Sequence, residues 1–326
     1  MNLMALNTSS VWDQPVSIHS ALAKTGVPMQ PVVRWAMVLV LLVVGTVLPK
    51  TAAQEERLQP QRVAIGEGVE LSYIERGRGI PVVFIHGTLG DYSVWEEQVH
   101  SFAASYRALA YSRRYNYPNT NQPRPAHSAI VEADDLAAFI KKLNLGKVHI
   151  VGHSYGAYAA LFLAVKHPEV VRTLTLAEPP VVFAGDTVDE AKQRAIKLAR
   201  TAFERGNAEE AVRAVVDSSE AGKYERIPKP FQQLLLRNAA ELKALVTSPE
   251  MYPPLDRDAV RKIRIPTLLL SGERSLSSLT SASKELKRLL PEMKCQHVVI
   301  PGTDHGMWFE QPEACRQAVL EFIGAQ

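Results

Sequence analysis

The sequence predicts an α/β fold: an eight-stranded, mostly parallel sheet with helices on both faces and an inserted helical cap. From Gln54 onward, short apolar runs rich in Val, Ile and Leu alternate with longer amphipathic stretches. This is the pattern of strands joined by crossover helices. The alternation stops between residues 181 and 261. A chain of 326 residues, 46% hydrophobic and 22% charged, is also able to bury a large core.

The first 53 residues differ in composition from the rest. Arg34 precedes the apolar run Trp35–Leu48, and small residues follow at 51–53. A positive flank, a short apolar core and a small-residue exit predict a signal peptide cleaved near residue 53. The protein is therefore expected to be exported, to the periplasm or the medium. If the segment is not cleaved, it is expected to be the only membrane anchor. A start at Met29 would give a more typical leader than a start at Met1.

Charge and cysteine content narrow the classes of partner. The formal charge is +3, and the residues before 54 contribute +2 of it, which leaves about +1 for the remainder. This balance does not indicate a nucleic-acid partner. The two cysteines, Cys295 and Cys315, are too few for a disulfide scaffold. We expect both to be buried and unpaired.

The strands follow from the β-branched and apolar runs, taken in order. They are Gln61–Ile65, Glu70–Glu75, Pro81–His86, Arg107–Ser112, Val148–Gly152, Arg172–Ala177, Thr267–Ser271 and Gln296–Ile300. Apolar residues at three- and four-residue spacing predict helices between them. These are Ser93–Phe102, His127–Leu143, Ser154–His167, Ser281–Leu290 and Pro312–Ile323.

The segment 181–261 contains helical patterns and no convincing strand. It is expected to be a cap inserted into a core made of residues 54–180 and 262–326. A cap of this size favours a small or medium substrate enclosed between cap and sheet.

A sharp turn is predicted where the strand Val148–Gly152 meets the following helix. Ser154 stands there between Gly152 and Gly156 in the string G-H-S-Y-G. A strand-to-helix turn of this kind needs glycines because neighbouring backbones approach closely, and it exposes the serine as a nucleophile. The competing interpretation is that Ser154 is an ordinary helix cap.

Two backbone amides are candidates for an oxyanion hole. The strand Pro81–His86 ends at Gly87 and Thr88. The amide of Thr88, together with that of Tyr155 at the helix start, could donate to a substrate oxygen. The competing interpretation is a plain turn at the strand end.

His305 is the candidate general base. It lies in the loop Pro301–Gly306 after the last strand, where a base can reach a serine above the sheet. Together these motifs resemble the α/β-hydrolase fold family over about residues 61–323. The resemblance implies serine chemistry without a metal or organic cofactor, and it says little about substrate.

The third member of the expected triad departs from the family pattern. The family usually carries an aspartate in a G-x-x-D string after the seventh strand, and Ser275 stands at that position. Glu178 is the favoured replacement because it follows the sixth strand, where a minority of the family, including some haloalkane dehalogenases, carries its acid. Glu273 is the second choice. Asp304 is the third, because it is adjacent to His305 in sequence and the side chains of adjacent residues rarely converge on one point. The absence of any functional acid also stays open.

Arg113 and Arg114 follow the fourth strand in an unusual string with three tyrosines. Structural ion pairs are one interpretation. The other is that one of these arginines binds an anionic or carbonyl group of the substrate at the pocket rim.

The resulting hypothesis is a hydrolase that cleaves an ester or related acyl bond through an acyl-enzyme on Ser154. A serine nucleophile argues against haloalkane dehalogenase and epoxide hydrolase, which attack with aspartate. Lactonase, carbon–carbon hydrolase and cofactor-free haloperoxidase activities stay open on the same triad. So does an inert hydrolase-like binding protein, for which the missing aspartate is the main support.

Overall fold

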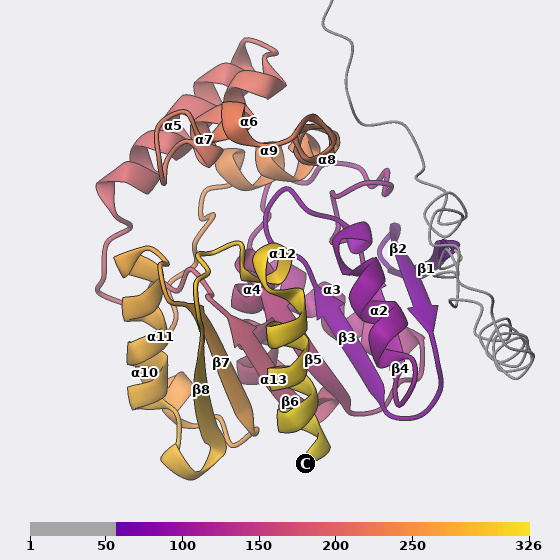
Figure 1. Cartoon of the computed structure of the whole chain (residues 1–326). Helices are drawn as coiled ribbons and strands as arrows, with labels where there is room; N and C mark the ends of the chain where they lie inside the picture. Colours follow the sequence, from indigo (N-terminus) through magenta and orange to yellow (C-terminus); the bar gives the residue numbers. More distant parts are fainter. Residues whose placement is uncertain (1–56) are drawn as a thin grey trace, which may run out of the picture. The chain divides into compact units, whose positions relative to one another are not determined.

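The computed structural model describes residues 57–326, and residues 58–326 form one compact unit. Its centre is an eight-stranded sheet in the order β1-β2-β4-β3-β5-β6-β7-β8 (Figure 1). β1 pairs antiparallel with β2, β2 pairs antiparallel with β4, and all other neighbours are parallel. The predicted fold class is therefore confirmed.

Each strand begins and ends within one residue of its predicted bounds. The strands are β1 (Gln61–Gly66), β2 (Val69–Arg76), β3 (Pro81–Ile85), β4 (Arg107–Tyr111), β5 (Val148–His153), β6 (Val171–Ala177), β7 (Thr267–Gly272) and β8 (Cys295–Ile300). The strands β3, β5 and β7 are buried along almost their whole length because helices cover both faces of the sheet there, whereas β8 at the sheet edge is partly exposed.

The helices divide between the two faces of the sheet. α3 (Ala129–Lys142), α4 (Tyr155–Lys166) and α11 (Ser277–Leu289) contribute to one apolar cluster. α2 (Glu96–Phe102) and α13 (Pro312–Gly324) contribute to the other. Adjacent residues of one strand point into different clusters, as Val82 and Val83 of β3 do. This alternation of side chains is what lets a single strand bury two faces.

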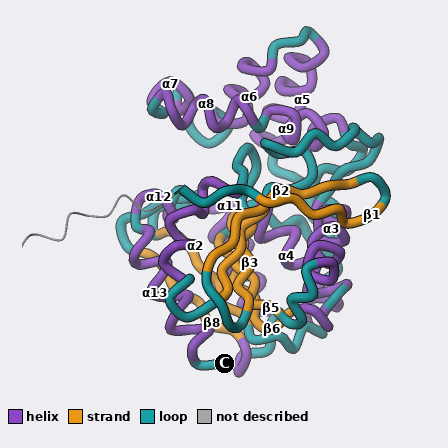
Figure 2. The backbone as a smooth tube through the Cα atoms, turned by 90° about the vertical axis from the view of Figure 1, so that its right-hand side faces the viewer, coloured by secondary structure: helices purple, strands orange, loops and turns teal. Residues whose placement is uncertain are grey.

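The inserted segment is helical, as its sequence pattern predicts. It contains α5 (Glu190–Glu204), α6 (Ala208–Val216), α7 (Lys223–Arg226), α8 (Lys229–Arg237), α9 (Ala239–Thr247) and α10 (Arg257–Arg261). A bridge between Phe183 and Leu255 joins the two ends of the segment. α5 to α9 lie above one end of the sheet (Figures 1 and 2).

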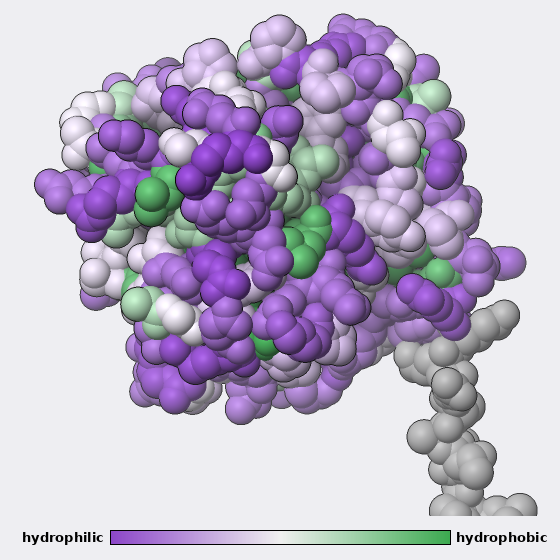
Figure 3. Space-filling model, turned by 90° about the horizontal axis from the view of Figure 1, so that it is seen from above, coloured by the Kyte–Doolittle hydropathy of each residue, from purple (hydrophilic) through white to green (hydrophobic). Residues whose placement is uncertain are grey.

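The outer face of this region is mainly hydrophilic, with small separate hydrophobic groups (Figure 3). Leu198 on α5 and Phe309 on α12 (Met307–Glu310) are among the large exposed apolar side chains. Phe309 packs edge-on against the ring of Phe231, and single exposed apolar residues such as Leu198 are normal on a folded surface.

Cys295 and Cys315 are both free and buried, as expected. Cys295 belongs to one apolar cluster and Cys315 to the other, so the sheet separates the two thiols. The expected signal peptide lies outside the described residues. Within residues 57–326, no helix is both long enough and apolar enough to cross a bilayer.

Candidate active site

Ser154 lies at the turn between β5 and α4 in a strained conformation. Its backbone angles are φ 53° and ψ −124°, and its side chain makes no capping hydrogen bond to the helix. The ordinary helix-cap interpretation therefore does not describe this serine. The Ser154 amide donates to the carbonyl oxygen of Ala177 at 2.8 Å, which ties the turn to the end of β6. Strain of this kind is retained where surrounding structure enforces it, commonly at functional sites.

The two glycines of the motif permit close backbone contacts. A Cβ atom on Gly156 would lie 2.4 Å from the carbonyl oxygen of His86, and one on Gly152 would lie 2.7 Å from Cα of Ala157. Both distances are shorter than any tolerable contact with backbone. The close packing of α4 against β3 and β5 thus requires glycine at both positions.

His305 and Ser154 are brought together from distant parts of the sequence. Nε2 of His305 lies 2.9 Å from Oγ of Ser154, although 151 residues separate them. The His305 side chain is 32% exposed and Ser154 is partly exposed, so the pair is accessible from solvent. This distance is that of a hydrogen bond through which a proton can pass from Oγ to Nε2.

Glu178 occupies the other side of the imidazole. Its Oε2 lies 2.7 Å from Nδ1 of His305, and its Oε1 accepts from the Gly272 amide at 2.9 Å. The side chain is fully buried. β6 lies beside β5 in the sheet, which explains how a residue after β6 reaches the base. Glu178 also has a positive φ of 48°, so two members of the Ser154–His305–Glu178 arrangement have strained backbones.

The other proposed acids make different contacts. Glu273 accepts from the Gly302 amide at 2.8 Å, and Asp304 accepts from the Gly306 amide at 2.6 Å. Ser275, at the usual aspartate position, has a buried hydroxyl without a hydrogen-bond partner among the described residues. Of the carboxylates that the sequence suggested, Glu178 is the one that the structure brings to His305.

The loop at Gly87 and the start of α4 lie beside the serine, and the oxyanion-hole roles of the Thr88 and Tyr155 amides stay a prediction. A Cβ atom on Gly87 would lie 2.9 Å from Cβ of Ser154, so the loop before Thr88 runs against the serine. Tyr155 is the first residue of α4, where an amide has no partner within the helix. Leu89, which follows Thr88, has a positive φ of 62°. The loop is thus a strained turn rather than a plain strand end.

Arg113 and Arg114 do not lie at the rim of the serine site. Arg113 is completely buried between Glu132 and Glu241, with N–O distances of 3.2 and 2.7 Å. Arg114 forms two hydrogen bonds with the buried Asp135. The expectation that either arginine binds substrate at the rim is corrected, because both guanidinium groups are already neutralised by protein carboxylates.

Two neighbours of the site were not found from the sequence. Nε2 of His153 lies 2.9 Å from the backbone carbonyl oxygen of His305, so the imidazole donates there and anchors the base. Glu241, on α9, accepts from the Leu89 amide at 3.1 Å. His153 stood in the recognised motif but had no partner in sequence, and nothing near Glu241 in the sequence distinguishes it from a surface helix glutamate.

Solved structures share this fold. An esterase from Thermogutta terrifontis aligns with a TM-score of 0.65 and 24% identity, covering 82% of this chain and 98% of its own. A carboxylesterase from Bacillus subtilis aligns with a TM-score of 0.69 and 17% identity, covering 82% of this chain and 92% of its own. At these identities the likeness establishes the fold alone.

Sequence relatives cover most of the chain. A 2-(acetamidomethylene)succinate hydrolase from Mesorhizobium japonicum is 28% identical over 276 residues, which are 81% of this chain and 95% of that protein. A 2-hydroxy-6-oxo-6-(2'-aminophenyl)hexa-2,4-dienoic acid hydrolase from Metapseudomonas resinovorans is 25% identical, covering 83% of this chain and 93% of that protein. The sequence pattern of the alpha/beta hydrolase family matches residues 82–318. This chain therefore belongs to the alpha/beta hydrolase family and is a hydrolase.

Proposed function

We propose that this hydrolase cleaves an ester or related acyl bond of a small or medium substrate through an acyl-enzyme on Ser154. The observation that carries the proposal is the continuous chain of contacts from Ser154 Oγ through His305 to Glu178, at 2.9 and 2.7 Å. A hydroxyl, an imidazole and a buried carboxylate in this order form the arrangement that activates a serine.

In the first step, Nε2 of His305 accepts the proton of Ser154 as Oγ forms a bond to the acyl carbon. The carbonyl oxygen becomes an oxyanion, and the amides of Thr88 and Tyr155 donate hydrogen bonds to it. Glu178 accepts from Nδ1–H, which holds the correct tautomer and stabilises the imidazolium. The imidazolium then gives its proton to the leaving oxygen as the acyl–oxygen bond breaks.

In the second step, His305 removes a proton from water, and the resulting hydroxide attacks the acyl-enzyme. The second tetrahedral intermediate collapses, Oγ of Ser154 recovers the proton, and the carboxylic acid product leaves. Each turnover consumes one water and returns the three side chains to their starting protonation states.

Labelling with a fluorophosphonate tests whether Ser154 is an activated nucleophile. We expect one adduct, located on Ser154 by peptide mass spectrometry, and none in Ser154→Ala. If the folded protein forms no adduct, the proposed acyl-enzyme mechanism on Ser154 fails. A panel of p-nitrophenyl esters of rising chain length, lactones and thioesters then identifies the bond. If the protein turns over only lactones, or only thioesters, that class becomes the proposed substrate in place of esters.

A further inference from the structure

The Thr88 amide belongs to a peptide whose other end is the carbonyl oxygen of Gly87. In a trans peptide the C=O and N–H groups point in opposite directions, so fixing one orients the other. Three donors hold the Gly87 oxygen: Nη2 of Arg113 at 3.1 Å, Nδ1 of His86 at 2.8 Å and the Gly90 amide at 3.3 Å. The orientation of the Thr88 N–H is therefore fixed by these three donors, which bind the opposite end of the same peptide.

His86 can act as such a donor because it is held neutral in one tautomer. Its Nε2 lies 3.1 Å from the backbone nitrogen of Arg113 and must accept, which leaves the hydrogen on Nδ1. Burial, followed by the positive charge of Arg113, lowers the pKa of His86 to about 3. Of the groups that hold the Gly87 oxygen, the guanidinium of Arg113 is thus the only cation.

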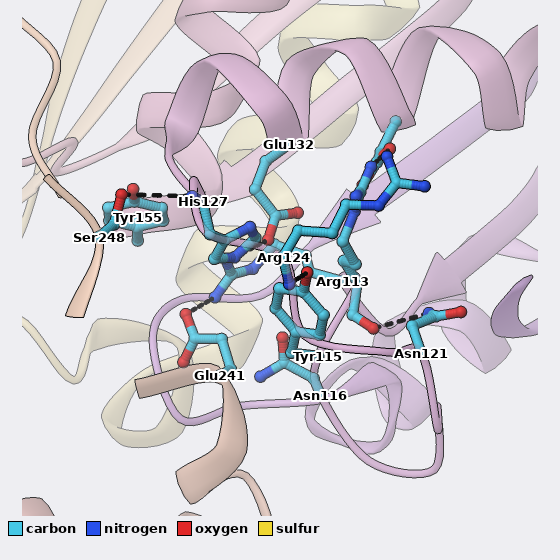
Figure 4. A network of polar contacts seen from close by, with 12 residues as sticks. Arg113, Tyr115, Asn116, Asn121, Arg124, His127, Glu132, Tyr155, Glu241 and Ser248 are labelled. Atoms are coloured by element: carbon cyan, nitrogen blue, oxygen red, sulfur yellow. Dashed lines mark hydrogen bonds and ion pairs between the residues drawn. The ribbon is translucent and has the colours of Figure 1, made fainter. Parts of the chain in front are cut away.

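The Arg113 charge is kept in place by two carboxylates from different parts of the chain (Figure 4). Burial opposes the charge, but Glu241 and Glu132 outweigh it and raise the pKa of Arg113. Burial likewise opposes ionisation of Glu132, yet Arg113 lowers its pKa to about 2. Arg113 also lies over the ring of Tyr155, with Cζ 5.3 Å from the ring centroid. One guanidinium therefore contacts the Gly87 carbonyl oxygen, at the other end of the peptide that carries the Thr88 amide, and the ring of Tyr155.

Glu241 connects this arrangement to the helical insert. Its Oε1 lies 2.7 Å from Nη2 of Arg113, and its Oε2 accepts from the Leu89 amide at 3.1 Å. The residues on both sides of Thr88 are thus bonded to one ion pair. A second set of contacts lies alongside, because Arg237 and Asn238 of the insert both donate to the buried Asp91. α9 thus has to be packed on the core for this set of bonds to exist.

We propose that Arg113 is a positioning residue for the oxyanion hole, and that Glu241 makes the hole depend on the packing of the helical insert. A cation on the Gly87 carbonyl orients the Gly87–Thr88 peptide and strengthens its N–H as a donor. These groups need no reorganisation during the reaction, because their contacts exist before substrate binds. This inference rests on the proposed function, since it assigns roles within the same acyl-transfer step.

The test compares Arg113→Met, Arg113→Lys and Glu241→Gln with Arg114→Met. Arg114 is a matched control because it also leaves a buried carboxylate unpaired, at Asp135, but does not contact Gly87. In folded Arg113→Met we expect kcat to fall about 10- to 100-fold with little change in KM, since removing an oxyanion donor outright costs about 10²- to 10³-fold. Arg113→Lys should recover part of this loss because it restores a cation.

Affinity for an aryl trifluoromethyl ketone, which forms an oxyanion on the serine, should fall in proportion to kcat/KM. Thermal unfolding and circular dichroism establish that each variant is folded. If Arg113→Met does not fold, Arg113→Lys and Glu241→Gln carry the same comparison. The inference is overturned if folded variants at 113 and 241 lose no more kcat or ketone affinity than Arg114→Met. Failure of the proposed function is distinguishable, because the unmodified protein would then lack both the fluorophosphonate adduct and turnover.

Discussion

Oε2 of Glu178 lies 2.7 Å from Nδ1 of His305, while the position that usually carries this acid holds Ser275. The carboxylate is fixed by a second bond to the Gly272 amide at the end of β7. The acid thus extends from one strand end toward the neighbouring one. Its location after β6 and its contact near β7 explain how the departure from the family pattern leaves His305 with a buried carboxyl partner.

Glu178→Gln should lower kcat/KM for the best acyl substrate by about 10³- to 10⁴-fold, because an amide nitrogen facing Nδ1 imposes the wrong imidazole tautomer. The measurement is steady-state kinetics on variants with unchanged circular dichroism. Glu273→Gln is the matched control and should change the rate less than about threefold. The reverse order of effects would move the role to Glu273.

His153→Leu should lower kcat about tenfold with little change in KM. The backbone carbonyl of His305 then loses its hydrogen bond from the His153 imidazole, and the His305 side chain is held less firmly in place. His153→Gln, which retains an N–H donor, should keep more of the rate. Equal rates for these two variants would show that the hydrogen bond does not position the base.

Gly156→Ala should destabilise the protein by about 1–3 kcal/mol or more, because the new methyl group meets two backbone carbonyl oxygens, at 2.4 and 2.6 Å. Urea unfolding gives the free energy of unfolding. Gly324→Ala is the matched control, since a Cβ atom there meets nothing within 4 Å. A Gly156→Ala protein as stable as this control would contradict the packing argument.

Acid should destabilise the fold in a window to which several histidines contribute, among them the buried His86 and His149. Burial lowers the pKa of His86 to about 3, and burial followed by the charge of Arg172 lowers that of His149 to about 4, against an ordinary value of 6.5. Unfolding below pH 6.5 therefore takes up protons that the folded state does not bind. The stability they contribute is complete above pH 6.5 and is lost as pH falls toward 4.

Each such proton contributes a slope of about 1.4 kcal/mol per pH unit to the free energy of unfolding. Chemical unfolding between pH 4.5 and 7.5 measures this slope. In His149→Gln, unfolding should take up about one proton fewer, so the slope should decrease by about 1.4 kcal/mol per pH unit. An unchanged slope in that variant would mean that His149 titrates alike in both states.

The alternation of apolar runs determined the sheet, since each of the eight strands lies within one residue of its predicted bounds. Parallel strands buried on both faces must be continuous apolar runs, so their sequence signal is strong. Ser154 was equally readable because its turn requires local glycines. Local signals of this kind do not depend on distant parts of the chain.

The choice among the acids, the fate of the arginines and the role of Glu241 depended on tertiary structure. Glu178 and His305 are separated by 127 residues, and Arg113 and Glu241 by 128. A carboxylate has no local pattern that names its partner, because the partner is decided by which strand ends and helices meet. The sequence by itself therefore determined the sheet, the candidate nucleophile and the candidate base. Only the packing of β6, β7 and α9 decided which carboxyl side chains contact the base and the loop after β3.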